Sequence, residues 1–151
     1  MKKLFLISCL SVICFEMMAQ KKSKPIYTAP FGVQAYTYRR TMPVNIERTL
    51  DSIAMLGFTE IEGGGGRIAP EDFKKLCNDR GISIPSTGTG YDNLVKDPMK
   101  VAEEAKALGA KYVMVAWIPH KTGAFNLENA KKAVQDFNTA GKVLKEQGIT
   151  L

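Results

Sequence analysis

The sequence predicts an α/β protein made of repeated strand–helix units that form part of a (β/α)8 barrel. Apolar helical stretches end at Gly57, Gly81, Gly109 and Gly148, and a strand-like stretch follows each glycine. Strands that alternate with helices form parallel sheets. The first strand is followed by YTYRRTMP, which lacks the glycine fingerprint of an open dinucleotide-binding sheet, so a barrel is favoured over that alternative.

The barrel is expected to be incomplete. A full barrel needs eight strands and about 250 residues. The sequence has 151 residues and supplies four strand–helix units and the beginning of a fifth strand at its end. We therefore expect residues 31–151 to be the N-terminal half of a barrel and Leu151 to be a truncation point. Such a half leaves strand edges unpaired, and homo-oligomers are one expected consequence.

The first 20 residues have the pattern of a secretory signal peptide. Lys2 and Lys3 precede the apolar run LFLISCLSVICF, and the small residue Ala19 lies near the expected cleavage point. The run is too short to span a bilayer as a helix, which takes about 20 residues. The alternative is an uncleaved anchor. Cleavage predicts a periplasmic or secreted protein without stable membrane insertion, in which residues 21–30 form a linker.

Charge and cysteine content exclude several classes of protein. The formal net charge is +6, but the lysines are scattered over candidate helices without interleaved aromatic residues, so we expect solvated faces and no nucleic-acid partner. Cys9 and Cys14 lie in the signal region, at positions that argue against lipidation. Cys77 is then the one thiol of the mature chain, which predicts a buried, inert side chain without a disulfide or metal cluster.

The elements are expected in regular order along the chain. Phe31–Tyr38 alternates apolar and polar residues and predicts the first strand. Asn45 can cap a helix that ends before Gly57. The remaining elements follow the same pattern: a strand at 58–62, a helix opened by Pro70, a strand at 82–86, a helix opened by Asp97 and Pro98, a continuous apolar strand at 111–119, a helix from Asn126 or Leu127 with Val134 among its apolar markers, and a strand from Ile149.

Four stretches of this sequence resemble the sugar phosphate isomerase/epimerase superfamily, the xylose isomerase-like TIM barrels. They are GVQAYTYRR, LGFTEIEGGGG, FKKLCNDRGISIPSTGTGYDNL and VAEEAKALGAKYVMVAW. The resemblance covers essentially the whole mature chain but only half of a family member. Many members carry a histidine at the end of the third strand. Here that stretch is SIPSTGTGYDN, which argues against the endonuclease branch of the superfamily.

The resemblance implies an isomerase or epimerase that acts on a sugar, cyclitol or keto acid. Its chemistry would be proton transfer next to a carbonyl, assisted by a divalent metal (Mn, Mg, Zn or Co). Family metal ligands lie mainly at strands five to eight, beyond Leu151, so this chain is expected to bind no metal and to be inactive alone. Two alternatives remain: a noncatalytic carbohydrate-binding barrel, and a lyase or hydrolase of oxidised sugars on the same scaffold.

Candidate substrate-binding residues follow from the rule that barrel chemistry lies at the C-terminal ends of strands. Gln34 and Tyr36 share one face of the first strand. Glu62 ends the second strand, where it could orient a substrate hydroxyl; the alternative is a structural carboxylate paired with Arg39, Arg40 or Arg67. The glycine run after Glu62 lacks the lysine and serine or threonine of a phosphate-binding loop, so a flexible loop is the simpler interpretation.

The third and fourth strands supply the remaining candidates. Thr87 and Thr89 could hydrogen-bond substrate hydroxyls. Trp117 could stack on a sugar ring, although filling the core is an equal alternative. His120, the one histidine of the chain, follows in the loop WIPHKTG as a candidate ligand or acid–base group. The partner predicted from the whole set is a small sugar-like molecule.

Overall fold

The structure is a computed structural model that describes residues 27–151, and the predicted signal peptide lies outside this range. Its centre is one parallel sheet of four strands in the order β1-β2-β3-β4. The strands are β1 (Gly32–Gln34), β2 (Glu60–Glu62), β3 (Ser83–Gly88) and β4 (Tyr112–Met114). The order follows the sequence without reversal, as in a barrel and unlike an open dinucleotide-binding sheet.

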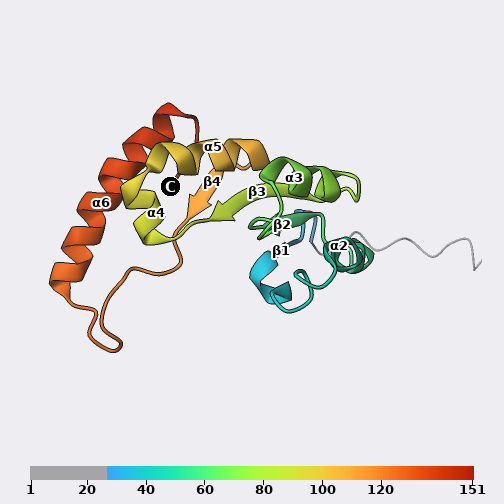
Figure 1. The fold of residues 1–151 in the computed structure, drawn as a ribbon, viewed down its shortest axis with the longest axis horizontal. Coiled ribbons are helices and arrows are strands. Elements are labelled where there is room, and N and C mark those ends of the chain that lie inside the picture. Colours follow the sequence, from blue (N-terminus) through green and yellow to red (C-terminus); the bar gives the residue numbers. More distant parts are fainter. Residues whose placement is uncertain (1–26) are drawn as a thin grey trace, which may run out of the picture.

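Helices connect the strands and cover one side of the sheet. In Figure 1, α3 and α5 run along the upper side of the strands, whereas the segments that follow β1 and β4 project below them. The helical elements are η1 (Ala35–Tyr38), α2 (Ile46–Met55), α3 (Pro70–Asn78), α4 (Tyr91–Lys96), α5 (Pro98–Leu108) and α6 (Leu127–Glu146). Among the described residues, none of these helices is long and apolar enough to cross a membrane.

The predicted helix signals are confirmed. The side chain of Asn45 accepts a hydrogen bond from the Arg48 amide at the start of α2, and Asp97 does the same for Lys100 at the start of α5. Asn126 forms a reciprocal capping box with Asn129 at the start of α6. Each glycine predicted to end a helix has a positive φ, for example +80° at Gly109, a conformation that other residues rarely adopt.

The core lies between the sheet and its helices. Its fully buried residues include Phe73 and Cys77 of α3, Leu50 of α2 and Ile61 of β2. Burial raises the pKa of the Cys77 thiol to about 11, so the thiolate is disfavoured at neutral pH. The prediction of a buried cysteine is therefore confirmed.

Two predicted strands are shorter than expected, one helix was not predicted, and one residue predicted to be in the core is exposed. The first strand ends at Gln34, and Ala35–Tyr38 is a 3-10 helix, so Tyr36 is not a strand residue. A short helix, α4, was not predicted because its six residues are too few for a periodic signal. The fourth strand, Tyr112–Met114, is shorter than the predicted 111–119, and Tyr112 in it is 54% exposed because its side chain lies on the sheet face opposite the buried Val113. Val134 of α6, expected to be apolar core, is also exposed.

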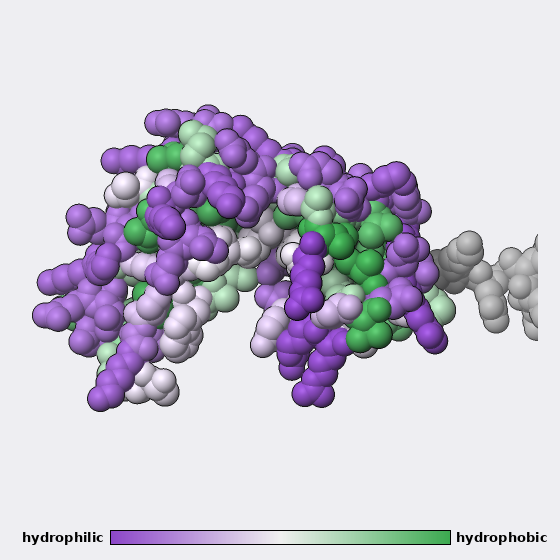
Figure 2. All heavy atoms as spheres, in the orientation of Figure 1, coloured by the Kyte–Doolittle hydropathy of each residue, from purple (hydrophilic) through white to green (hydrophobic). Residues whose placement is uncertain are grey.

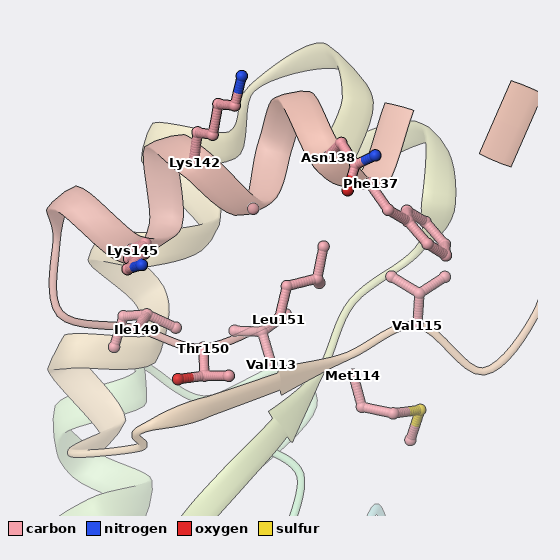
Figure 3. A pocket seen from close by; sticks show the side chains of 11 residues that line it. Val113, Met114, Val115, Phe137, Asn138, Lys142, Lys145, Ile149, Thr150 and Leu151 are labelled. Carbon is pink, nitrogen blue, oxygen red and sulfur yellow. The ribbon is translucent and has the colours of Figure 1, made fainter. Parts of the chain in front are cut away.

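The fifth strand begins where the sequence predicts. Thr150 forms a parallel bridge with Tyr112, and the Val113 amide donates to the Thr150 carbonyl at 2.8 Å. Beyond it, a groove of about 830 Å³ lies between β4 and α6. In Figure 3, Leu151 points toward α6 inside this groove, whereas Met114 points to the opposite side of β4. The groove thus occupies the place where a further strand would continue the sheet.

The face of the molecule drawn in Figure 2 is mostly hydrophilic. Figure 2 shows purple side chains over α5 and α6, with green groups gathered near α2 and β1. Exposed apolar residues around β1 and α2 include Tyr27, Phe31, Val44, Met55 and Leu56.

Candidate functional site

Two predicted site residues meet at the ends of adjacent strands. Gln34 ends β1 and Glu62 ends β2, and the two residues are partners in the parallel pairing. The Gln34 Nε2 group donates a hydrogen bond to Glu62 Oε1 at 3.0 Å. No ion pair between Glu62 and an arginine exists among residues 27–151, so the structural alternative for this carboxylate is not realised there.

The strand pairing extends this pair into a row across the sheet. Glu62 pairs with Ser86, and Ser86 pairs with Tyr112. We call Gln34, Glu62, Ser86 and Tyr112 the polar row. All four side chains are at least partly exposed, because they lie on the sheet face that the helices do not cover. In a closed barrel this face is the interior, where polar groups meet a ligand or one another.

Thr87 lies on the other face. It is 8% exposed and pairs with Val113, which is buried beneath the helices. Strict alternation from Ile82 and Ile84 would place Ser86, and not Thr87, on the buried side. The pairing of β2 with β3 is irregular, because Glu60 pairs with Ser83 and Glu62 pairs with Ser86. Strand β3 thus has one extra residue in this interval, and the extra residue reverses the alternation of its side chains. Thr87 therefore faces the helices, and Ser86 lies on the open face of the sheet.

The glycine run after Glu62 has structural reasons of its own. Gly63 has a φ of +116°, and its amide donates to the Ser86 carbonyl at 3.0 Å. A Cβ at Gly65 would lie 2.6 Å from Ile68 Cγ1 and 2.8 Å from Phe73 Cδ2, closer than real side chains approach. Close packing thus accounts for Gly65 and left-handed backbone for Gly63 and Gly66, whereas Gly64 has room for a side chain.

Tyr36 and Thr89 lie beside this site without joining the polar row. Tyr36 is 67% exposed on η1, and the Arg39 guanidinium lies 4.6 Å from its ring centroid. Thr89 follows β3, and its amide donates to the Met114 carbonyl at 2.9 Å. The half-buried Thr89 side chain therefore lies where β3 and β4 end.

Trp117 and His120 come together in the loop from β4 to α6. Their ring centroids are 4.3 Å apart and nearly parallel, and Phe125 meets His120 edge-on at 5.1 Å. We call Trp117, His120 and Phe125 the aromatic cluster. Trp117 is 59% exposed, so it does not fill the core. Phe125 was not among the predicted site residues, because nothing in the sequence indicates that it folds back onto His120.

A second polar contact ties α4 to α6. The Tyr91 hydroxyl donates to Asp136 Oδ2, and Lys132 Nζ forms an ion pair with the same oxygen at 2.6 Å. The hydrogen bond to Asp136, together with burial, raises the pKa of Tyr91 to about 12. Lys132 and Tyr91 hold the pKa of the Asp136 carboxyl below its usual range. This contact fixes α4, which follows the loop that contains Thr89.

Neither the groove nor any acidic cluster adds a metal site. The groove beside α6 contains none of the predicted site residues, and its lining is apolar except for a few side chains such as Lys142 and Lys145 (Figure 3). Within residues 27–151, no three histidine, cysteine or acidic side chains are grouped so that they could hold a metal ion. The chemistry that these residues offer is hydrogen bonding and ring stacking.

Comparison with known proteins gives similar solved structures. No family model and no curated protein matches the chain. A sugar phosphate isomerase/epimerase from Parabacteroides distasonis matches with a TM-score of 0.67, 24% identity, 87% of this chain and 52% of that chain. The protein described as the probable 3-DHS dehydratase AsbF of petrobactin synthesis from Bacillus anthracis matches with a TM-score of 0.60, 9% identity, 80% of this chain and 50% of that chain.

The description of a third similar structure includes the name of a fold. This structure is a xylose isomerase-like TIM barrel/4-hydroxyphenylpyruvate dioxygenase fusion protein, with a TM-score of 0.58, 19% identity, 80% of this chain and 21% of that chain. The chain has the fold of a xylose isomerase-like TIM barrel. It spans about half the length of the first two structures that it matches, so the part described is a half-barrel. Two of the three structures have descriptions that match the superfamily that the sequence resembles.

Proposed function

We propose that this half-barrel is the substrate-orienting part of an exported isomerase or epimerase that acts on a sugar-like molecule. The observation that carries the proposal is the Gln34–Glu62 pair, which places a carboxylate at the end of a barrel strand. The structural neighbour named as a sugar phosphate isomerase/epimerase supports the same class of chemistry.

The free atoms of the pair suit a polyhydroxylated substrate. Glu62 Oε1 already accepts from Gln34, so Glu62 Oε2 and Gln34 Oε1 remain as acceptors. Two acceptors side by side can bind the hydroxyls of neighbouring carbons. Ser86, next in the polar row, adds a hydroxyl that donates or accepts. These residues would bind and orient the substrate so that its acidic C–H bond faces a base.

These residues do not supply the ligands of the metal that the proposed reaction would need. A divalent metal would stabilise the enediolate that forms when a proton leaves the carbon next to a carbonyl. The described residues do not fit a metal site, as shown above, so a metal would need ligands from outside residues 27–151. We therefore assign binding and orientation, and no proton transfer, to the half-barrel.

Export bears on the choice of substrate. Sugar phosphates are mostly cytoplasmic, so the predicted signal peptide favours a substrate without a phosphate group. The glycine run after Glu62 is consistent with this choice, because it lacks the lysine and the serine or threonine of a phosphate-binding loop. The substrate class that we propose is a neutral keto sugar or cyclitol.

The test is proton exchange. The complete reading frame is expressed with manganese, incubated with keto sugars in deuterium oxide, and followed by NMR for deuterium uptake at the carbon next to the carbonyl. Exchange that is lost in Glu62→Gln supports the proposal. A folded protein that binds sugars without exchange would instead be a carbohydrate-binding barrel.

A lyase is the second candidate. The similar structure described as a dehydratase shows that this scaffold is not restricted to isomerases. In the same experiment a lyase would release water from the substrate and form an unsaturated product, which NMR distinguishes from an epimer. That result would replace the isomerase proposal.

A further inference from the structure

The loop from β4 to α6 holds three rings that pack on one another outside the core. Trp117 stacks on His120 with a centroid distance of 4.3 Å, and Phe125 meets His120 edge-on at 5.1 Å. Trp117 is 59% exposed and Phe125 is 49% exposed, so the cluster presents aromatic surface to solvent. Exposed aromatic surface that is already ordered loses little conformational entropy when a ligand binds.

The main chain fixes the hydrogen-bonding pattern of the histidine. His120 Nδ1 lies 2.6 Å from the Ile118 carbonyl oxygen. A carbonyl oxygen only accepts, so Nδ1 carries the hydrogen and, in the neutral ring, Nε2 is the acceptor. No hydrogen bond from the Trp117 indole N–H is present among the described residues, which leaves this donor available.

The cluster therefore combines an apolar face with one donor and one acceptor. This combination matches a pyranose ring, which has an apolar face of C–H groups and a rim of hydroxyls that both donate and accept. An aromatic ligand would use the face but not the polar edge. A phosphate would need cations, and the cluster itself has none while His120 is neutral.

We infer that the aromatic cluster binds the C–H face of an unphosphorylated pyranose, with His120 Nε2 accepting a hydrogen bond from a ring hydroxyl. The inference rests on the proposed function, because both assign a sugar to the same end of the barrel. The cluster follows the C-terminal end of β4, and the Gln34–Glu62 pair is at the C-terminal ends of β1 and β2.

The chain contains one tryptophan, so its fluorescence reports on the cluster alone. We would titrate the purified protein with methyl hexopyranosides, methyl pentopyranosides and glucose 6-phosphate while following Trp117 emission. The expected result is a saturable change with at least one neutral glycoside and a weaker response to the phosphate. His120→Ala and Phe125→Leu should each weaken binding about tenfold, the effect of losing one hydrogen bond or one ring contact.

Val134→Ala is the matched control, because Val134 is an exposed apolar residue on α6 outside the cluster. It should bind like the unchanged chain. Absence of a saturable change with every sugar, or unchanged binding by His120→Ala and Phe125→Leu, would overturn the inference. Proton exchange with no effect of these two variants would overturn the inference but leave the proposed function standing. Sugar binding at the cluster without proton exchange would support the inference but overturn the proposed function.

Discussion

Gln34 and Glu62, 28 residues apart in sequence, are joined by a hydrogen bond of 3.0 Å between Gln34 Nε2 and Glu62 Oε1. The pairing of β1 with β2 brings them together, since they are register partners. One strand–helix–strand unit thus holds a carboxylate in a defined orientation on the open face of the sheet. Gln34 acts on Glu62 as a positioning residue and also leaves its own carbonyl oxygen free.

Replacing Glu62 with glutamine should impair function without unfolding the protein. The amide oxygen can still accept from Gln34, but the second carboxylate oxygen becomes an amide that donates. Loss of a hydrogen bond to a charged group should lower kcat/KM for proton exchange about tenfold or more. Thermal unfolding should be nearly unchanged. Glu60→Gln, on the same strand and face, is the control and should retain activity.

Gly65→Ala should destabilise the fold. Its Cβ would lie within 3.0 Å of atoms of Ile68 and Phe73, both of which pack around the core. Overpacking of this kind costs about 1–3 kcal/mol in the free energy of unfolding. Gly64→Ala is the matched control, because its Cβ would come no closer than 3.9 Å to Leu108. Urea unfolding midpoints measure both, and equal midpoints for the two variants would contradict the packing argument.

Local signals predicted most of the fold. Asn45, Asp97 and Asn126 start helices because a side-chain oxygen can bond a free amide of the first turn, and this depends only on neighbouring residues. The strand order followed from the alternation of elements. The end of β1 was missed because an alternating polar pattern does not distinguish a strand from the 3-10 helix of Ala35–Tyr38.

The site was less predictable than the fold. The Gln34–Glu62 pair depends on strand register. The position of Ser86, and not Thr87, on the open face depends on an irregular strand pairing that no local pattern reveals. Phe125 reaches His120 through a loop whose path is set by tertiary structure. In each case the missing information is the relative position of two segments that are separate in the sequence.

The Tyr91–Asp136 contact should make stability depend on pH at both extremes. The raised pKa of Tyr91 contributes stability that is fully present below pH 10.0, its ordinary value, and is lost as pH rises through about 12. The lowered pKa of Asp136 contributes stability that is present above 3.8 and is lost as pH falls through the folded-state value. Tyr91→Phe should remove the loss of stability at alkaline pH, which urea unfolding at several pH values would measure.

Tyr36→Phe is the control for this series, because Tyr36 lies on η1 at the surface and its hydroxyl makes no hydrogen bond among the described residues. It should behave like the unchanged protein at every pH. If Tyr91→Phe kept the same alkaline loss of stability, the contact between α4 and α6 would not be its source.

Asn126→Ala should lower stability through the first turn of α6. It removes the hydrogen bond that the Asn126 side chain accepts from the Asn129 amide, whereas the Asn126 main-chain amide can still donate to the Asn129 side chain. The expected loss is about 0.5–2 kcal/mol in the free energy of unfolding. Asn138→Ala, on the exposed surface of the same helix, should change it by less than about 0.5 kcal/mol.

Cys77 should resist thiol reagents in the folded protein and react at once in denaturant. It is fully buried, and burial raises its pKa to about 11, so both access and thiolate formation are suppressed. The sequence has 3 cysteines, and Cys9 and Cys14 belong to the predicted signal peptide. Protein recovered from the periplasm or medium should therefore show one titratable thiol after denaturation. Cys77→Ala should show none, whereas additional thiols in that variant would show that the first residues are retained.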